Sequence, residues 1–500
     1  MNKLLKKIVF CIGIIALMQM SMNAQNEVDA LRFSEIDWQG SARFMGAGKA
    51  FGAVGAEFSA LNTNPASIGL YKKSEITFTP LTISAYRAES EYNGNLYSVR
   101  APKYNIGSVG MVLAINGISS TLWKKFQIGF GYNRVNNFNN FFNIEGRNDG
   151  KTIGSVYAES ATNQELDIRY LQNPDIWSDE MWLAGEYWLI SPKEGSFISY
   201  IPEMRGVDMK QISNVSRHGG NDEMVFSFGT NYDDKLFLGA TLGVPVVNFT
   251  ENRDYFEIND KEKNIYNMQR FEIHDKLVVK TTGINLKLGI IYQPFDFLRL
   301  GLSFHTPTYF GNVRDHFERK ISASMRIVDS LNITHYPINE INYINNYNYS
   351  LSTPLRAMFN AAFFISQRAF ISAEYEFVDY STANMNALDY NFSEENRAIQ
   401  NKYGACHIAR IGAEINVNQV LALRAGYNYI SSPYKNNIND GSKHYISAGL
   451  GFRTKYFFSD FAYALTTTKE QYWMYDPEFV NAVNNKFLMH RIVLTVGVRF

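Results

Sequence analysis

The chain ends with the stretch HRIVLTVGVRF, residues 490–500. One set of alternate side chains in it is wholly apolar: Ile492, Leu494, Val496, Val498 and Phe500. The other set mixes polar and small residues: Arg491, Val493, Thr495, Gly497 and Arg499. This alternation, ending on an aromatic residue, is typical of a membrane β-barrel, whose residues face lipid and lumen in turn. A strand of a soluble β-sandwich can alternate in the same way, but it rarely ends on an aromatic residue.

Strands of the same kind recur through the chain. They are predicted over residues 126–132, 224–228, 284–292, 298–304, 371–377, 411–417, 421–429 and 446–452. Their second face is mostly polar, charged or glycine, whereas a soluble barrel would fill its interior with Val, Ile and Leu. We therefore expect the apolar face to lie against lipid. Short links alternate with long polar stretches, which predicts an all-β, transmembrane antiparallel barrel of about fourteen strands.

The chain divides into three predicted parts. Residues 1–24 combine early lysines with an apolar run over 8–20 and a small residue at Ala24, which predicts a secretory signal peptide. Residues 25–73 do not alternate, and residues 74–500 are predicted to form the outer-membrane barrel. Within the barrel, residues 163–202 contain Trp177, Trp182 and Trp188, so we expect a folded extracellular excursion there.

Composition restricts the class of protein. Aromatic residues make up 15% of the chain, yet the mean hydropathy is −0.22 and no second apolar run reaches the length of a spanning helix. A helical membrane protein is therefore excluded. Cys406 is the one cysteine beyond the predicted signal, so no intramolecular disulfide is expected. The 48 acidic and 48 basic residues give a net charge of zero, which argues against a nucleic-acid partner.

The segment 25–73 is rich in small residues, which allow close backbone packing. It contains GSARFMGAGKAFGAVG at 40–55 and Asn64-Pro65-Ala66 further on. We predict that it folds into the barrel as a plug; a periplasmic arm, or a first strand with loose glycine spacing, is the alternative. The glycines do not form a nucleotide-binding loop, because Lys49 is followed by Ala50 rather than Ser or Thr.

The block from Gly40 to Tyr71 resembles the N-terminal hatch of the FadL/TodX-type outer-membrane transporters of hydrophobic compounds, and in particular the variants labelled hemin receptor or aromatic-hydrocarbon transporter. Further matching pieces are residues 303–307, 352–356 and 373–381. The resemblance implies a barrel plugged by the hatch, to which Phe58, Asn64, Pro65 and Ala66 would belong. It also implies passive uptake of long-chain fatty acids or aromatic hydrocarbons, with lateral release into the bilayer at a kinked third strand.

The segment that corresponds to the third strand is residues 126–137, where the alternation fails after Tyr132. Arg134 would otherwise face lipid, which is costly. A bulge or inward bend between Asn133 and Asn137 would remove this conflict, and Asn133, Arg134 and Asn137 are therefore the candidate lateral gate. The alternative is that Arg134 marks the membrane interface at the end of the strand.

A carboxylate head group on the ligand would need a cation in the lumen. The candidates are Arg299, Lys287, Arg424 and Arg453. Acids and bases inside a barrel are more often ion pairs than catalysts. The eight histidines form no pair at metal-ligand spacing, and no nucleophile motif is present, so we expect no enzyme, metal or cofactor.

The predicted function is passive transport of a hydrophobic small molecule across the outer membrane of a Gram-negative-type cell. The expected partners are the ligand, outer-membrane lipid and the barrel-assembly machinery, which would read Phe500; the barrel is expected to be a monomer. A barrel component of a protein secretion or surface-attachment system is the main alternative, and a general polar-solute porin is another. The fold alone does not decide among them.

Overall fold

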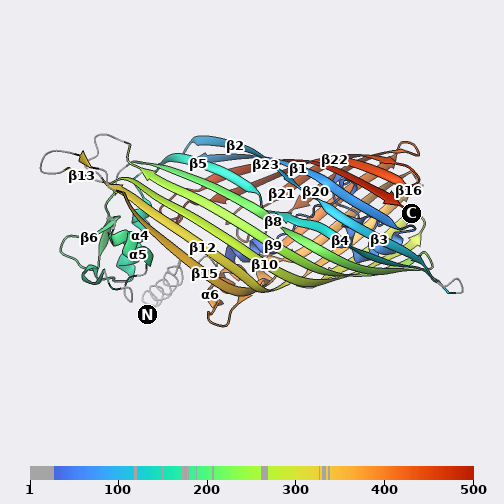
Figure 1. Ribbon diagram of the computed structural model, residues 1–500, viewed down its shortest axis with the longest axis horizontal. Coiled ribbons are helices and arrows are strands. Elements are labelled where there is room, and N and C mark those ends of the chain that lie inside the picture. The colour runs from blue at the N-terminus through green and yellow to red at the C-terminus, as the bar shows by residue number, and fades with distance from the viewer. Residues whose placement is uncertain are drawn as a thin grey trace, which may run out of the picture.

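A computed structural model shows a closed antiparallel barrel of 14 strands with an N-terminal plug (Figure 1). It describes residues 27–500 except 118–120, 149, 172, 174–176, 178, 187–188, 205–207, 261–267, 326, 329–333, 336–337 and 367. The predicted signal peptide and Trp188 lie outside the described residues. The barrel closes where β1 (Glu75–Tyr92) pairs with β23 (Val483–Arg499). Among the described residues, no helix has the length and apolar character to cross a membrane.

The remaining wall strands follow in chain order. They are β2 (Asn95–Asn105), β3 (Ser108–Asn116), β4 (Trp123–Asn137), β5 (Asn140–Asn148), β8 (Met209–Tyr232), β9 (Leu236–Ile258), β10 (Met268–Phe295), β11 (Leu298–His305), β12 (Tyr309–Met325), β15 (Ile338–Ser352), β16 (Arg356–Ile365), β17 (Ala369–Asp379), β18 (Asn384–Asn386), β19 (Ala405–Asn416), β20 (Leu421–Ile430), β21 (Lys443–Arg453) and β22 (Phe457–Tyr472). Two consecutive strands, such as β2 and β3 or β4 and β5, together form a single strand of the 14-strand wall.

The two faces of the wall differ as the alternation predicts. In β21, the side chains of Ile446, Leu450 and Phe452 are 59%, 49% and 49% exposed on the outside. The intervening Tyr445 and Ser447 are buried against the plug. The outward apolar face and the inward polar face are therefore confirmed.

The two ends of the barrel differ in the length of their connections. At the end near the C-terminus the strands are joined by short turns, such as residues 233–235 between β8 and β9. At the other end, strands β8, β9, β10, β12 and β15 extend far beyond their neighbours (Figure 1). Here lies a folded excursion with α4 (Ile153–Asn163), η3 (Ile168–Tyr170), α5 (Asp179–Glu186), β6 (Ile190–Pro192) and β7 (Tyr200–Pro202). The short β13 (Ile327–Val328) and β14 (Thr334–His335) form a separate hairpin.

The plug fills the lumen with short helical turns: α2 (Glu27–Ser34), α3 (Ala42–Gly46), η1 (Phe58–Asn62) and η2 (Pro65–Leu70). Ser41 caps α3 by accepting a hydrogen bond from the backbone of Phe44, and Asn64 caps η2 through the N–H of Ala66. Most of its side chains are buried. We call residues 27–73 the hatch.

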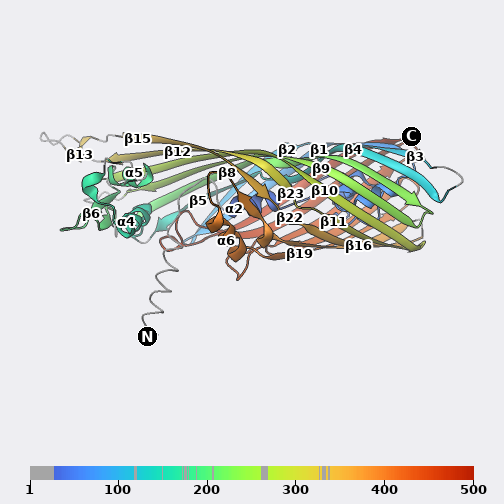
Figure 2. The same ribbon diagram turned by 90° about the horizontal axis from the view of Figure 1, so that it is seen from below.

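A second layer covers α2 of the hatch. The loop that follows β17 carries η4 (Tyr380–Thr382) and α6 (Ser393–Lys402), and α6 packs against α2 (Figure 2). The excursion buries Tyr157 and Trp177 in one apolar cluster with the inner faces of β5, β9 and β10. The outer mouth of the barrel is therefore filled by apolar packing.

Candidate functional site

The wall is interrupted between β2 and β5. In the part of the chain that the structure describes, β2 pairs with β1 alone, over Asn95–Asn105, and β5 pairs with β8 alone, over Asn140–Asn148. Below this break, β3 and β4 form a regular ladder that ends where Ser108 faces Asn133. We call the boundary between β2 and β5 the seam. Two unpaired strand edges meet there, which a closed barrel otherwise avoids.

The strand β5 leans inward from the wall. The ring of Phe142 lies 5.1 Å from that of Tyr472 and 5.9 Å from that of Phe487, which are inner-face residues of β22 and β23. The alpha carbon of Gly146 is so close to Tyr92 of β1 that a Cβ at this position would lie 2.3 Å from the ring. β5 therefore packs on the inner surface of the strands beside the seam.

The hatch supplies the hydrogen bonds that β2 does not. The N–H of Asp37 donates to the carbonyl of Val135 at 3.1 Å, and the N–H of Gln39 donates to the carbonyl of Arg134 at 3.1 Å. On the other edge of β4, the register against β8 shifts between Arg134 and Asn136. The bulge expected between Asn133 and Asn137 is present, and it turns Val135 into the hatch core.

Arg134 is neutralised at the base of the seam. Asp222 of β8 accepts two hydrogen bonds from the Arg134 guanidinium, from Nε at 2.7 Å and from a terminal nitrogen at 2.9 Å. It also accepts a hydrogen bond from the Tyr132 hydroxyl at 2.6 Å. Asn137 accepts a bond from the backbone of Asn139. Asn133 is fully buried, and its side-chain amide has no hydrogen-bond partner among the described residues. Their role as a gate remains a prediction.

The lumenal side of the seam is aromatic. Phe138, directly after the bulge, lies 6.0 Å from Phe33 of the hatch and 5.6 Å from Phe249 of β9, measured between ring centres. These rings belong to a larger apolar cluster between α2 and the inner faces of β9, β10, β12 and β15. Across the seam itself, the Lys103 ammonium lies 5.4 Å above the Phe141 ring. The lumen beside the seam therefore offers aromatic rings, one of which, Phe249, also carries the ion-paired guanidinium of Arg32 at 4.2 Å from the ring centre.

Two of the predicted ligand cations contact the hatch. Lys287 is buried, pairs with Glu223 and lies 5.1 Å above the Trp38 ring. Arg299 donates to the Val54 carbonyl at 2.8 Å and to Gln293 at 2.8 Å, and stacks on Phe364. It has no acidic partner among the residues the structure describes.

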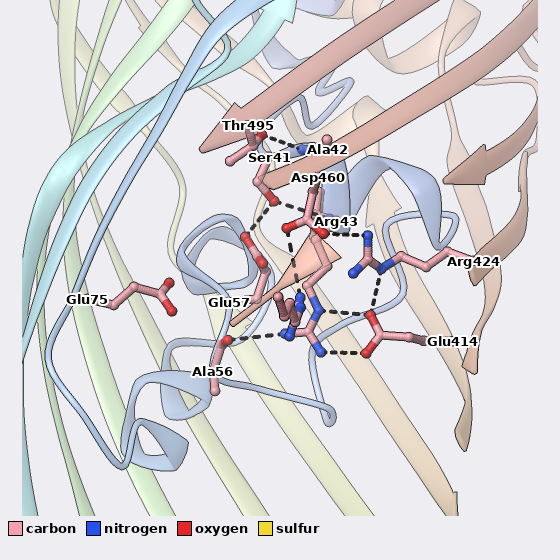
Figure 3. A network of polar contacts seen from close by, with 12 residues as sticks. Ser41, Ala42, Arg43, Ala56, Glu57, Glu75, Glu414, Arg424, Asp460 and Thr495 are labelled. Carbon is pink, nitrogen blue, oxygen red and sulfur yellow. Dashed lines mark hydrogen bonds and ion pairs between the residues drawn. The ribbon is translucent and has the colours of Figure 1, made fainter. Parts of the chain in front are cut away.

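The other two predicted cations belong to an ionic network between hatch and wall (Figure 3). Arg424 pairs with Glu414 at 2.6 Å and with Asp460 at 2.7 Å, and Arg453 lies 3.8 Å from Asp460. Arg43 of the hatch completes the network, because its guanidinium makes two bonds of 2.9 Å to Glu414. The network fastens the hatch to β19, β20 and β22. Whether any of these cations contacts a ligand remains a prediction.

Comparison with solved structures shows a similar overall fold. A Pseudomonas aeruginosa FadL homologue superposes with a TM-score of 0.53 at 11% identity, over 93% of this chain and 99% of that one. The chain has the fold of a FadL homologue. The Pseudomonas putida toluene transporter TodX gives 0.49 at 12% identity over 93% and 99%, and the Ralstonia pickettii toluene transporter TbuX gives 0.47 at 14% over 92% and 99%. No protein-family model and no curated protein matches the sequence.

In this barrel the hatch rests directly on the backbone of the wall. Asn64 donates to Asn360 at 3.0 Å, and the Asn64-Pro65-Ala66 turn lies on Gly239 and Gly289, where an added Cβ would meet hatch atoms at 2.3 and 2.1 Å. Inward-facing wall glycines that contact the hatch in this way are Gly110, Gly129, Gly131, Gly229, Gly239, Gly289, Gly301, Gly412, Gly426 and Gly449. We call them the glycine collar. Phe58 packs on two of its members, Gly110 and Gly131.

Sequence reasoning missed an ionic anchor of the hatch near the seam. Asp37 accepts bonds of 2.5 Å from Lys49 of the hatch and from Arg491 of β23. Burial opposes ionisation of Asp37, but the two cations outweigh it and hold its pKa well below the usual range. Burial lowers the pKa of Lys49 to about 8, against the opposing effect of Asp37. No spacing signal in the sequence links Asp37 to Arg491, 454 residues away.

We predict that Asp37→Asn loosens the hatch at the seam. Removing the carboxylate leaves Lys49 and Arg491 buried without their counter-charge, which costs about 3 kcal/mol. Amide hydrogen exchange over residues 36–50, followed by mass spectrometry, is expected to accelerate about a hundredfold. An unchanged exchange rate in this segment would show that Asp37 does not anchor the hatch. Asp440→Asn is the matched control, because Asp440 lies in an exposed loop and its carboxylate accepts hydrogen bonds from Ser442.

Proposed function

We propose that this protein is an outer-membrane channel for passive uptake of hydrophobic small molecules, which leave sideways through the seam. The observation that carries the proposal is the break in the wall between β2 and β5, whose lumenal side is lined by Phe33, Phe138 and Phe249. A compound with little aqueous solubility gains from contact with such rings. The unpaired strand edges beside these rings would be the exit to the bilayer.

The lumen supports hydrophobic cargo rather than polar solutes. One apolar cluster fills the mouth of the barrel, and a second surrounds α2. The rest of the hatch is close-packed against the glycine collar. A general porin keeps a polar, water-filled channel. The arrangement therefore disfavours the polar-solute alternative and supports a route that avoids the hatch.

The pairing of the cations bears on the ligand class. Lys287, Arg424 and Arg453 each face an acid, and Arg299 lies under the hatch, bonded to the Val54 carbonyl. At the seam, Arg134, Arg32 and Arg217 each face an acid, and Lys103 stacks on Phe141. We therefore favour uncharged aromatic compounds over long-chain fatty acids, which would need a cation for their carboxylate.

Uptake by cells that produce the barrel tests this proposal. We expect radiolabelled toluene to enter these cells about tenfold faster than cells without the barrel. The barrel is expected to raise the uptake rate of oleate by a smaller factor and to leave that of sucrose unchanged. Equal gains for sucrose and toluene would indicate a polar pore. No gain for any compound, with a stoichiometric protein partner copurifying, would favour the secretion or surface-attachment role.

A further inference from the structure

Three hydrogen-bonded tyrosine–histidine pairs lie on the outer face of the barrel. The Tyr375 hydroxyl lies 2.7 Å from Nδ1 of His407, that of Tyr427 lies 2.8 Å from Nδ1 of His444, and that of Tyr463 lies 2.7 Å from Nδ1 of His490. The tyrosines are 45%, 39% and 40% exposed. We call these residues the tyrosine–histidine row.

The three pairs share one geometry. Each tyrosine stands on a strand that rises from a short turn (β17, β20 and β22), and each histidine stands on the strand that follows in the wall (β19, β21 and β23). His407 faces Phe377, His444 faces Tyr429 and His490 faces Leu465, so each histidine is two positions further from the short turns than its tyrosine. The pairs therefore occupy three adjacent hairpins at intervals of about 10 Å.

The row lies at the upper edge of the outward apolar belt. Towards the short turns, the next outward residues of β21 and β23 are the exposed Ile446 and Ile492. In the other direction, the strand β21 ends at Lys443, beside His444, and β22 and β23 turn polar at Thr467 and Lys486. An edge of this kind is where the interface of a membrane lies.

Each pair has one hydrogen-bond donor to spare. A neutral imidazole and a phenol carry two polar hydrogens, and their mutual bond uses one in either tautomer. For the six side chains of the row, the described residues provide no further hydrogen-bond partner. A donor left without an acceptor at the edge of the apolar layer is costly, so the row requires acceptors from outside the chain.

A cationic spot adjoins the third pair. Lys469 of β22 and Lys486 of β23 face each other directly on the outer face, on the side of His490 that leads away from the short turns. Like charges placed opposite one another repel unless an anion lies between or near them. Glu89 lies 4.0 Å from Lys486, and Lys469 has no acidic partner among the described residues.

We propose that the tyrosine–histidine row binds the phosphate groups of membrane lipids, with Lys469 and Lys486 adding charge at the third pair. Phosphate oxygens at the membrane interface would accept the spare hydrogens, while the acyl chains lie on the apolar belt below. The proposal rests on the membrane location given under the proposed function but not on transport. It assigns a lipid-binding surface to the outer face of the C-terminal strands, β17 to β23.

Native mass spectrometry of the full barrel, released from detergent, tests the row with phosphatidylglycerol as the probe. We expect the wild type to retain up to three lipids. A sixfold variant, H407F/H444F/H490F combined with Y375F/Y427F/Y463F, is expected to retain several-fold fewer, because phenylalanine keeps the apolar rings and removes both polar hydrogens of each pair. Dioleoylglycerol, which lacks phosphate, is expected to bind weakly to both. The control H274F/H316F replaces two histidines on the extended part of β10 and β12 that are bonded to acidic residues rather than to tyrosines, and it is expected to bind lipid as the wild type does.

Three outcomes would overturn the proposal. The first is equal retention of phosphatidylglycerol by the wild type and the sixfold variant. The second is an equal loss of phosphatidylglycerol in the control. The third is retention of dioleoylglycerol equal to that of phosphatidylglycerol. Heat-modifiable migration on a denaturing gel verifies that every variant is a folded barrel. Failure of toluene uptake would overturn the proposed function and leave this result unaffected.

Discussion

Bridging the seam is expected to stop hydrophobic uptake. In a C406S background, the variant K103C/F141C places one thiol on each side of the break, since Lys103 of β2 stacks on Phe141 of β5. A short bis-maleimide would then hold the two strand edges together. We expect toluene uptake to fall by about tenfold or more, equivalent to at least about 1.4 kcal/mol on the barrier of the rate-limiting step.

The matched control places the same bridge on a paired part of the wall. Ala361 and Ala373 face each other outward on β16 and β17, which are already joined by a continuous ladder. A361C/A373C with the same reagent should leave uptake unchanged. Full uptake by the bridged seam variant, with cross-linking verified by mass spectrometry, would rule out lateral exit between β2 and β5.

The second large effect is expected from Gly289→Val in the glycine collar. A Cβ there would lie 2.1 Å from Oδ1 of Asn64 and 2.8 Å from the backbone nitrogen of Ala66. Backbone cannot move aside as a flexible side chain can, so the Asn64-Pro65-Ala66 turn must leave its seat. Overpacking and the lost Asn64–Asn360 bond together cost about 3 kcal/mol.

The measurement is permeability to sucrose together with hydrogen exchange over residues 58–70. An unseated hatch opens the lumen, so we expect sucrose entry to rise and exchange of this segment to accelerate about a hundredfold. Gly311→Val in β12, where a Cβ meets only the Tyr309 ring at 3.2 Å, is the control. A sucrose-tight G289V barrel with native exchange would show that the turn does not depend on the collar.

The barrel could be predicted because its signal is local. Period-two alternation places Ile446, Leu450 and Phe452 outside within a single strand, whatever the neighbouring strands are. The hatch was predictable for a similar reason, since small residues without alternation cannot form a half-apolar strand. The bulge after Tyr132 followed from one outward arginine, Arg134, in an otherwise apolar face.

The partners of the charged residues could not be predicted. Alternation shows that Lys287 and Arg424 face inward, but not that Glu223 and Asp460 face them, because these pairs depend on strand order and register. The anchor of Asp37 on Arg491 joins the two ends of the chain. The alternation of side chains shows that Gly289 and Gly412 face inward. The need for glycine follows only from the position of the hatch, whose atoms leave no room for a Cβ at either residue.

The seam was the hardest feature to predict. β2 and β5 each look like an ordinary strand, and the break arises because β5 packs on inner-face residues such as Tyr472 and Phe487. The aromatic patch of Phe33, Phe138 and Phe249 likewise combines residues from the hatch, β9 and the segment after the bulge. The ligand-binding and gate residues named from the sequence stay predictions.

Photolabelling with a small aromatic diazirine during uptake tests the central claim most directly. The probe resembles toluene in size, and cross-linked residues are read by mass spectrometry with and without excess toluene. Passage through the seam predicts labels on Phe33 and Phe138 that excess toluene removes, beside labels on the outer belt that it does not. Labels confined to outward residues such as Ile446 and Leu450, with none inside the barrel, would contradict it.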